Sequence, residues 1–247
     1  MQIQPLKTHH MKPFESLIGL LDRYMTKLNE QTIVCITSKI VSLSQGRLVP
    51  MDQISKSALV HQEADLILDA PHAIEGMNLT IKNNLLIPAA GIDASNSAGH
   101  YILYPEQAGL VAAQLWAHLR GRHGVKELGV VITDTRSTPL RWGVTGLAIG
   151  WCGFKPLYSY EGKKDLDGRT LHNTHVSVVD CLATAAVLMM GEGDEQTPLA
   201  VITHAPKIRF MDRSPTQEEA SQVLVSMEND IYGPLLKSEQ WSAPSRT

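Results

Sequence analysis

Short apolar runs alternate along this chain with longer segments of helical periodicity, and this alternation restricts the fold more than any other feature. Four runs have the length and β-branched content of buried strands, at residues 32–37, 84–87, 129–133 and 198–203. Five segments repeat apolar residues at spacings of three and four and are predicted helices, at residues 14–28, 53–69, 106–122, 175–190 and 214–231. Strands and helices do not alternate one-for-one, and we expect long Gly-rich loops between 136 and 174. The pattern therefore favours an α+β (mixed α/β) fold over a regular doubly wound sheet.

The domain boundaries are simple. No flexible linker interrupts the middle of the chain, so residues 1–247 are predicted to form a single unit. Residues 214–217, Ser-Pro-Thr-Gln, indicate a capping box with proline at the first helical position of the last helix. Residues 234–247 are expected to form a flexible tail.

Charge and cysteine content exclude several classes of protein. Lys and Arg number 22 against 25 Asp and Glu, a net charge of −3 without the basic block that binds nucleic acid or anchors a chain to a membrane. No apolar run reaches the roughly 18 residues that span a bilayer, and the N-terminus has no apolar segment typical of a secretory signal. Cysteines at 35, 152 and 181 indicate neither a disulfide framework nor a metal knuckle. We therefore expect a cytoplasmic protein that acts on small molecules, without nucleic-acid or membrane partners.

The first candidate site is an acidic turn at residues 90–96, Ala-Gly-Ile-Asp-Ala-Ser-Asn. Gly91 permits an unusual backbone conformation, and Asp93, Ser95 and Asn96 bring hard oxygen ligands into one turn. An Asx-turn that closes the preceding strand is the structural alternative.

The second candidate is Asp134, which follows the predicted strand 129–133. Carboxylates at the carboxyl ends of strands take part in phosphate and metal chemistry in open α/β sheets. A turn or a helix N-cap would explain the same residue without any chemistry.

The third candidate lies in residues 190–195, Met-Gly-Glu-Gly-Asp-Glu, at the end of an apolar helix. Gly191 is explained by a helix stop alone. Carboxylates beside the negative end of a helix are unfavourable unless a cation compensates them, and this favours a metal. Asp93, Asp134 and Glu192 together predict a site for one or two Mg²⁺ or Mn²⁺ ions that act with a phosphorylated substrate.

Motifs of several competing chemistries are missing from the sequence. It contains no HExxH or cysteine cluster for zinc, no GxxxxGK[ST] or GxGxxG for nucleotides, and no GxSxG for a serine hydrolase. Gly143, Gly146 and Gly150 are spaced for close packing or a tight backbone instead. Arg141 and Arg169, in Gly-rich segments, are the best basic candidates for a catalytic contact to phosphate or carboxylate, with a solvated loop as the simpler explanation for each.

Six strings resemble the coenzyme F420 gamma-glutamyl ligase family, and they occur in the order expected for its members. They are ITSKIVSLSQGR (36–47), AGIDASN (90–96), GVVITDT (129–135), RWGVTGLAIGWCG (141–153), GKKDLDGRTL (162–171) and MGEGDEQTP (190–198). The similarity runs across nearly the whole chain, and several motifs in order are more specific than any one of them. The resemblance suggests a divergent, bacterial-type member, and it implies a homodimer with a mixed α/β fold that P-loop enzymes do not share.

The resemblance also implies an activity, which is amide-bond formation between L-glutamate and a deazaflavin precursor. GTP is the implied co-substrate and a divalent metal, Mg²⁺ or Mn²⁺, the implied cofactor. In the implied route GTP phosphorylates the acceptor carboxylate, and the glutamate amine then displaces phosphate from the acyl phosphate.

The family pattern assigns roles residue by residue. Metal ligands are implied at Asp93, Asp134, Thr135 and Glu192. Asp134 is also expected to be essential for catalysis, and the two arginines chosen above from their sequence context, Arg141 and Arg169, are expected to take part in it. The expected nucleotide contacts are Ser38, Lys39, Asn96, Met190, Gly191, Gly193 and Asp194.

Several positions depart from the family pattern. Leu43 stands where the family has a lysine that contacts the nucleotide, and a neutral side chain cannot replace that ammonium. Thr8-His-His-Met11 replaces a Gly-Leu-Pro segment, Tyr104-Pro-Glu replaces an Asp-Pro-Asp, and Cys181 replaces a glutamate. The metal ligands are thus retained, whereas nucleotide and acceptor recognition are expected to differ. Two alternatives stay open: a folate-type acceptor, and a homologue that binds nucleotide and metal without turnover.

Overall fold

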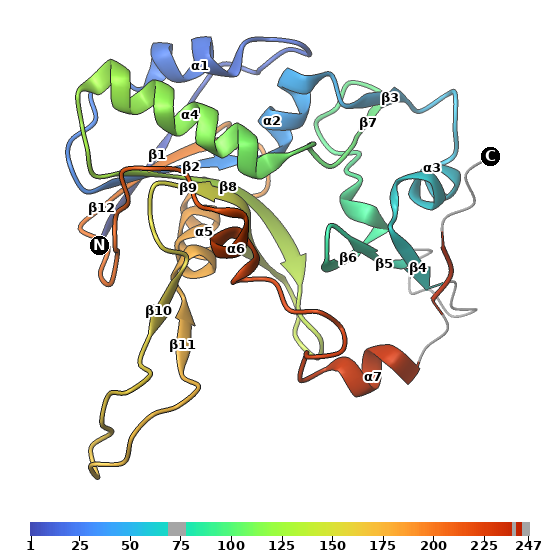
Figure 1. Cartoon of the computed structure of the whole chain (residues 1–247). Coiled ribbons are helices and arrows are strands. Elements are labelled where there is room, and N and C mark those ends of the chain that lie inside the picture. The colour runs from blue at the N-terminus through green and yellow to red at the C-terminus, as the bar shows by residue number, and fades with distance from the viewer. Residues whose placement is uncertain (69–77, 239–240, 244–247) are drawn as a thin grey trace.

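The computed structural model describes residues 1–68, 78–238 and 241–243 (Figure 1). At its centre is a sheet of five strands in the order β1-β12-β2-β8-β9. These strands are β1 (Gln2–Leu6), β12 (Leu199–Thr203), β2 (Thr32–Thr37), β8 (Leu128–Ser137) and β9 (Val144–Cys152). Strands β2 and β8 run parallel, and the other neighbours are antiparallel. The predicted mixture of α and β structure is confirmed.

Helices cover both faces of this sheet (Figure 1). One face carries α1 (Leu17–Tyr24) and α4 (Ala108–His123), and the other carries α5 (Val178–Met190). Because side chains alternate along a strand, Val34 and Ile36 of β2 join the core beneath α1 and α4, whereas Ile33 and Cys35 join the core beneath α5. Strand β2 is buried on both sides, and this accounts for its unbroken apolar sequence.

Glycines let β9 lie directly against helix backbones on both faces. A bulge in the β8–β9 ladder inserts a residue into β9, so Gly146 and Gly150 face opposite sides of the sheet. A Cβ atom at Gly146 would lie 2.6 Å from the carbonyl oxygen of Ala183 in α5, and one at Gly150 would lie 2.5 Å from that of Ala108 in α4. The close packing predicted for these glycines is confirmed.

Two small sheets beside the central one enclose a second, smaller core that includes Leu59, Ile67 and Leu103. One sheet pairs β3 (Leu48–Pro50) with β7 (His100–Ile102), and the other joins β4 (Leu66–Leu68), β5 (Leu79–Lys82) and β6 (Leu85–Pro88). Helix α2 (Ser38–Gln45) follows β2 directly, and α3 (Lys56–Glu63) packs against the short 3-10 turn Ala89–Gly91. This region carries the Asp93 turn.

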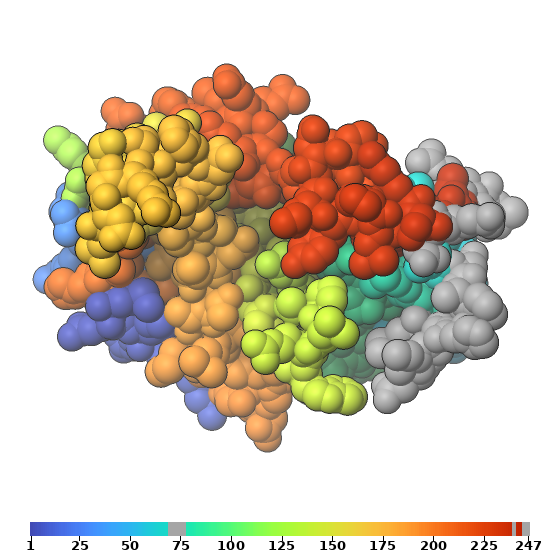
Figure 2. Space-filling model, turned by 90° about the horizontal axis from the view of Figure 1, so that it is seen from below, coloured from blue at the N-terminus to red at the C-terminus, as the bar shows by residue number. Residues whose placement is uncertain are grey.

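An arm projects from the body of the molecule (Figure 1). It consists of β10 (Leu157–Ser159) paired with β11 (His175–Ser177) and of the loop that joins them. The C-terminal segment contains the short helices α6 (Gln217–Ser221) and α7 (Gly233–Ser238). Seen from below, the yellow arm and the red C-terminal segment lie on opposite sides of one face, and the yellow-green tip of the β8–β9 hairpin lies next to the red segment (Figure 2). None of the helices in the described residues has the length and apolar character needed to cross a bilayer.

Two predictions about elements are wrong. The stretch between 136 and 174 was expected to be loops, but it contains β9 and β10. Glycines within β9 and the exposure of its first two residues weaken the strand signal in the sequence. The helix predicted over 214–231 ends at Ser221, and its capping box is formed by Thr216 and Glu219 rather than by Ser214. Helix α6 has no buried residue, so no packed face supports its extension.

Other boundaries shift by a few residues. The first predicted helix shortens to α1, where the Ser16 hydroxyl accepts the Gly19 N–H, and the helix predicted over 53–69 becomes α3 followed by β4, with residue 69 outside the described residues. The helix predicted from 175 begins at Val178, after β11. The segment expected to be a tail from 234 contains α7, and Ser242 forms a β-bridge with Ile67. Residues 239–240 and 244–247 of that segment lie outside the described residues.

Candidate functional site

A pocket of about 280 Å³ opens at the carboxyl ends of the parallel strands β2 and β8, where Thr37 pairs with Thr133. The first residues of α2 and three further segments complete its wall, at residues 8–11, 91–105 and 190–198. The carboxyl ends of parallel strands are a common place for ligand sites, because the connections that follow diverge there and leave a crevice.

Asp134 reaches the pocket from β8. Its Oδ1 accepts the Thr135 backbone N–H at 2.7 Å, and the Ser38 hydroxyl also hydrogen-bonds to the carboxylate. Burial raises the pKa of Asp134 to about 6, the two hydrogen bonds oppose the rise, and the nearby charges of Glu192 and Asp93 add to it. The folded protein therefore leaves the Asp134 charge largely uncompensated.

Asp93 reaches the pocket from the turn before β7, and its backbone exchanges hydrogen bonds with Ile102 at 3.0 and 2.8 Å. Its Oδ2 lies 2.7 Å from Lys39 Nζ, and its Oδ1 accepts the Ser95 N–H at 2.7 Å. Burial alone would raise the pKa of Asp93, but the Lys39 ammonium and the Ser95 hydrogen bonds outweigh it and hold the pKa below its ordinary value. The hydrogen bond from the Ser95 N–H forms an Asx-turn, which was the structural alternative for Asp93. The same side chain also lines the pocket, so the turn and a functional role are compatible.

The loop after α5 supplies the third acid, Glu192. Gly191, with φ at 79°, turns the chain out of the helix. The Gly193 N–H donates to Glu195 Oε2 at 2.8 Å, and the Gly193 carbonyl accepts Asn96 Nδ2 at 3.3 Å, which joins this loop to the Asp93 turn. Burial raises the pKa of Glu192, Lys39 lowers it in part, and neighbouring carboxylates add to the rise.

The three predicted acids thus line one pocket. Within the ranges that the structure describes, no group of three or more His, Cys, Asp and Glu side chains is close enough together to hold a metal ion. The chemistry of the donor set nevertheless fits a hard divalent cation, because a cation would relieve the raised pKa values of Asp134 and Glu192.

Comparison with known proteins places the chain in a family. The sequence model described as F420-0:Gamma-glutamyl ligase matches residues 6–204. The chain belongs to this family. A coenzyme F420:L-glutamate ligase of Methanopyrus kandleri is 32% identical over 249 aligned positions, which cover 94% of this chain and 97% of that protein. One of Methanothermobacter thermautotrophicus is 30% identical over 206 positions, covering 77% of this chain and 81% of that protein.

The region matched by the F420-0:gamma-glutamyl ligase family contains the three acids and the loops that join them. A third relative, from Haloarcula marismortui, is 32% identical over 200 positions, covering 71% of this chain and 76% of that protein, and it is also named coenzyme F420:L-glutamate ligase. These relatives are archaeal, so they give no support to the expectation of a bacterial-type member.

Most of the residues expected from the family pattern line this pocket. Thr135 lines the pocket beside Asp134. The expected nucleotide contacts that line it are Ser38, Lys39, Asn96, Met190, Gly193 and Asp194. Gly191 does not line the pocket. Its positive φ lets the backbone turn from α5 into the Glu192 loop.

The two predicted arginines do not reach this pocket within one chain. Arg141 lies at the tip of the β8–β9 hairpin and Arg169 in the loop of the arm, and both are exposed (Figure 1). The Arg169 N–H donates to Asp165 Oδ1 at 2.7 Å, which closes the loop on itself. The solvated-loop explanation therefore describes both positions in the single chain.

Two parts of the pocket were seen in the sequence only as departures from the family pattern, namely residues 8–11 and Tyr104. The Thr8 N–H donates to the Gln196 carbonyl at 3.0 Å, and the His9 ring is held by Glu15 at 2.6 Å. Their position depends on the pairing of β1 with β12, which ends beside the Glu192 loop. No local sequence signal reports that pairing, so these residues could not be assigned to the pocket beforehand.

Proposed function

We propose that the chain is a metal- and GTP-dependent ligase that joins L-glutamate to a carboxylate of a coenzyme F420 precursor through an amide bond. The observation that carries the proposal is the convergence of Asp93, Asp134 and Glu192 on one pocket beside Lys39, in a chain whose relatives are named coenzyme F420:L-glutamate ligases.

The three acids, together with Thr135, would hold one or two Mg²⁺ or Mn²⁺ ions. When bound, the metal would offset the negative charge of the nucleotide phosphates. Lys39 supplies a second positive charge, since its ammonium lies among the same groups, 2.7 Å from Asp93 and 2.9 Å from the Ser95 hydroxyl. The Asn96–Gly193 hydrogen bond keeps two of the acidic loops together as a wall for the nucleotide.

The proposed route passes through an acyl phosphate. An oxygen of the acceptor carboxylate attacks the γ-phosphorus of GTP, and GDP leaves. The deprotonated amine of L-glutamate then attacks the acyl carbon, a C–N bond forms, and inorganic phosphate leaves. A free carboxylate is a poor electrophile at neutral pH, whereas the acyl phosphate carries a good leaving group. The contribution of the pocket is positioning and charge stabilisation.

One observation favours a second candidate function, a homologue that binds nucleotide and metal without turnover. Leu43 lines the pocket where the family pattern has a lysine, and among the described lining residues Lys39 is the only Lys or Arg. The retained acids argue for the ligase, because burial makes the charges of Asp134 and Glu192 costly to keep without a positively charged ligand.

Phosphate release by purified protein tests the ligase. With Mn²⁺, GTP or ATP, L-glutamate and a panel of deazaflavin and folate-type acceptors, phosphate release is expected only with the true acceptor, and chelation of the metal should abolish it. Asp134→Asn should abolish release while the protein stays folded, and Asp52→Asn, at an exposed position outside the pocket wall, should behave as wild type. The absence of release with every acceptor, together with metal-independent nucleotide binding, would reject the ligase in favour of the second candidate.

A further inference from the structure

Tyr104 has a buried hydroxyl group without a hydrogen-bond partner. The residue is 5% exposed, and within the described part of the chain its Oη makes no hydrogen bond. A buried polar group is costly unless it is paired, so an orphaned hydroxyl in the wall of a pocket is a candidate for pairing with a ligand. Tyr104 is one of the residues that line the pocket of the three acids.

The Tyr104 ring fits against a glycine of the Asp93 turn. A Cβ atom at Gly91 would lie 2.5 Å from Cδ2 of the ring, and Gly91 has φ at 72°. The absence of a side chain at position 91 therefore leaves the space that the ring occupies. This contact places the tyrosine against the turn that also carries Asp93.

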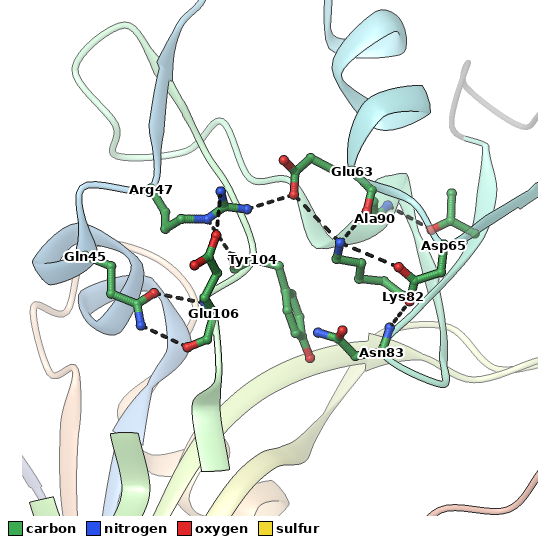
Figure 3. Close-up of polar contacts among 10 residues, drawn as sticks. Gln45, Arg47, Glu63, Asp65, Lys82, Asn83, Ala90, Tyr104 and Glu106 are labelled. Atoms are coloured by element: carbon green, nitrogen blue, oxygen red, sulfur yellow. Dashed lines mark hydrogen bonds and ion pairs between the residues drawn. The ribbon is translucent and has the colours of Figure 1, made fainter. Parts of the chain in front are cut away.

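Two side chains hold the backbone on either side of Tyr104 (Figure 3). Gln45 donates from Nε2 to the Glu106 carbonyl at 2.9 Å and accepts the Glu106 N–H at 2.9 Å. Arg47 accepts the Leu103 N–H on its carbonyl oxygen at 3.0 Å, and its Nε donates to the Tyr104 carbonyl at 3.3 Å. The backbone around the ring is thus held at Leu103, Tyr104 and Glu106.

Arg47 is itself fixed by two ion pairs. Its guanidinium lies 2.8 Å from the Glu63 carboxylate on α3 and 3.1 Å from the Glu106 carboxylate. Figure 3 shows the Tyr104 ring running from this bracket toward the broad ribbon of β8, the strand that bears Asp134. The hydroxyl is therefore held in place before any ligand binds, and pre-organised groups lose little entropy when a ligand arrives.

The charge near the hydroxyl favours donation of its proton rather than loss of it. Burial raises the pKa of Tyr104, and the Asp134 carboxylate is close enough to raise it further, so the phenol stays neutral at physiological pH. A neutral donor suits an oxyanion beside the acidic residues, because the hydroxyl can donate a hydrogen bond to the anion without transferring its proton to a carboxylate.

We propose that the Tyr104 hydroxyl contacts the substrate and donates a hydrogen bond to a phosphoryl or carboxylate oxygen bound next to Asp134. This inference rests on the proposed function for the identity of the oxyanion, which belongs to GTP, to the acceptor or to L-glutamate. It adds to the pocket a specificity-determining residue outside the three acidic loops.

Tyr104→Phe tests the inference, because it removes the hydroxyl and keeps the ring against Gly91. The melting temperature should stay within about 2 °C of wild type or rise, since the hydroxyl has no partner to lose. Because the variant loses a hydrogen bond to a charged group, its kcat/KM should fall roughly tenfold to hundredfold. Separate titrations of GTP, acceptor and L-glutamate should place a raised KM on the one substrate whose oxygen is contacted. Tyr101→Phe, on β7 and outside the pocket wall, is the matched control and should match wild type.

The outcomes separate this inference from the proposed function. Wild-type turnover with an equally active Tyr104→Phe variant would overturn the inference alone, as would a clear fall in melting temperature. If the wild type does not turn over, calorimetric titrations with GTP plus Mn²⁺ and with L-glutamate replace the kinetics. Binding weakened about tenfold in Tyr104→Phe then supports the inference although the ligase fails. Equal affinities in the two proteins, or no binding of either probe to the wild type, overturn it.

Discussion

The charged carboxylate of Asp134 lowers the stability of the ligand-free protein. Its carboxylate has a folded-state pKa of about 6 against an ordinary value of 3.8. Between these pH values the folded protein keeps a proton that the unfolded chain has lost. The carboxylate is therefore destabilising above about pH 6, and this penalty is relieved as the pH falls from about 6 toward 4. Asp93 behaves in the opposite way, since its lowered pKa contributes stability that is lost only as the pH falls through the acidic range.

We predict that Asp134→Asn stabilises the metal-free protein at pH 7.5 while it removes activity. The gain should be on the order of 2 kcal/mol, and it should shrink as the pH approaches 5, because wild-type Asp134 becomes protonated there. Urea unfolding of both proteins with chelator present, at several values between about pH 5 and pH 8, measures it. An identical pH dependence in the two proteins would show that Asp134 is not the perturbed group, and Asp52→Asn, at an exposed position, controls for the loss of one acidic charge.

At the scale of elements, β9 connects the helices on the two faces of the sheet to the site. Asp134 pairs with Leu147 of β9, and Gly146 beside it touches the backbone of α5, which ends at the Glu192 loop. The separation of two of the pocket acids therefore depends on how closely α5 lies against β9.

Gly146→Ala and Gly150→Ala should each destabilise the protein by about 1–3 kcal/mol, because the new methyl group meets helix backbone that has no room to move. Chemical denaturation measures the loss. Gly146→Ala should also lower activity more than Gly150→Ala, since it displaces the helix that leads to Glu192. Gly121→Ala in α4, where a Cβ has open space, is the matched control and should be neutral or stabilising. Wild-type stability in both β9 variants would contradict the close packing.

At the scale of the molecule, the two hairpin tips carry large apolar side chains that this chain does not cover. Leu140 and Trp142 on the β8–β9 tip and Leu166 on the arm are fully exposed. Both tips lie on the face shown in Figure 2. Fully exposed apolar side chains at the ends of projecting hairpins are typical of surfaces that another protein covers.

We propose that a second copy of the chain covers these tips, in keeping with the homodimer implied by the family resemblance. Light scattering coupled to size exclusion should give the mass of a dimer, about twice 27.1 kDa. Trp142→Ser combined with Leu140→Ser should increase the monomer fraction at low concentration. Leu110→Ser, an exposed apolar residue on the outer face of α4, should leave the dimer intact. A monomer at all concentrations would exclude the proposal.

The sequence by itself determined the buried strand at 32–37 and the buried part of β8 at 129–133, and it indicated close packing at Gly146 and Gly150. These features are local. A strand that is buried on both faces has an unbroken apolar sequence, and a position where two backbones lie in close contact requires a glycine. The sequence also singled out the three acids by their positions near the ends of predicted elements, although β8 continues through Asp134 to Ser137 instead of ending at Thr133.

Tertiary structure alone decided which segments meet. The pairing of β1 with β12 brought residues 8–11 to the pocket, the Gln45 and Arg47 bracket placed Tyr104 beside Asp134, and the long β8–β9 hairpin carried Arg141 away from it. Strand order and hairpin length depend on contacts between residues that are distant in the chain. Such contacts produce no regular spacing of apolar residues in the sequence, because each side chain involved packs against a particular distant partner and not along one repeating buried face.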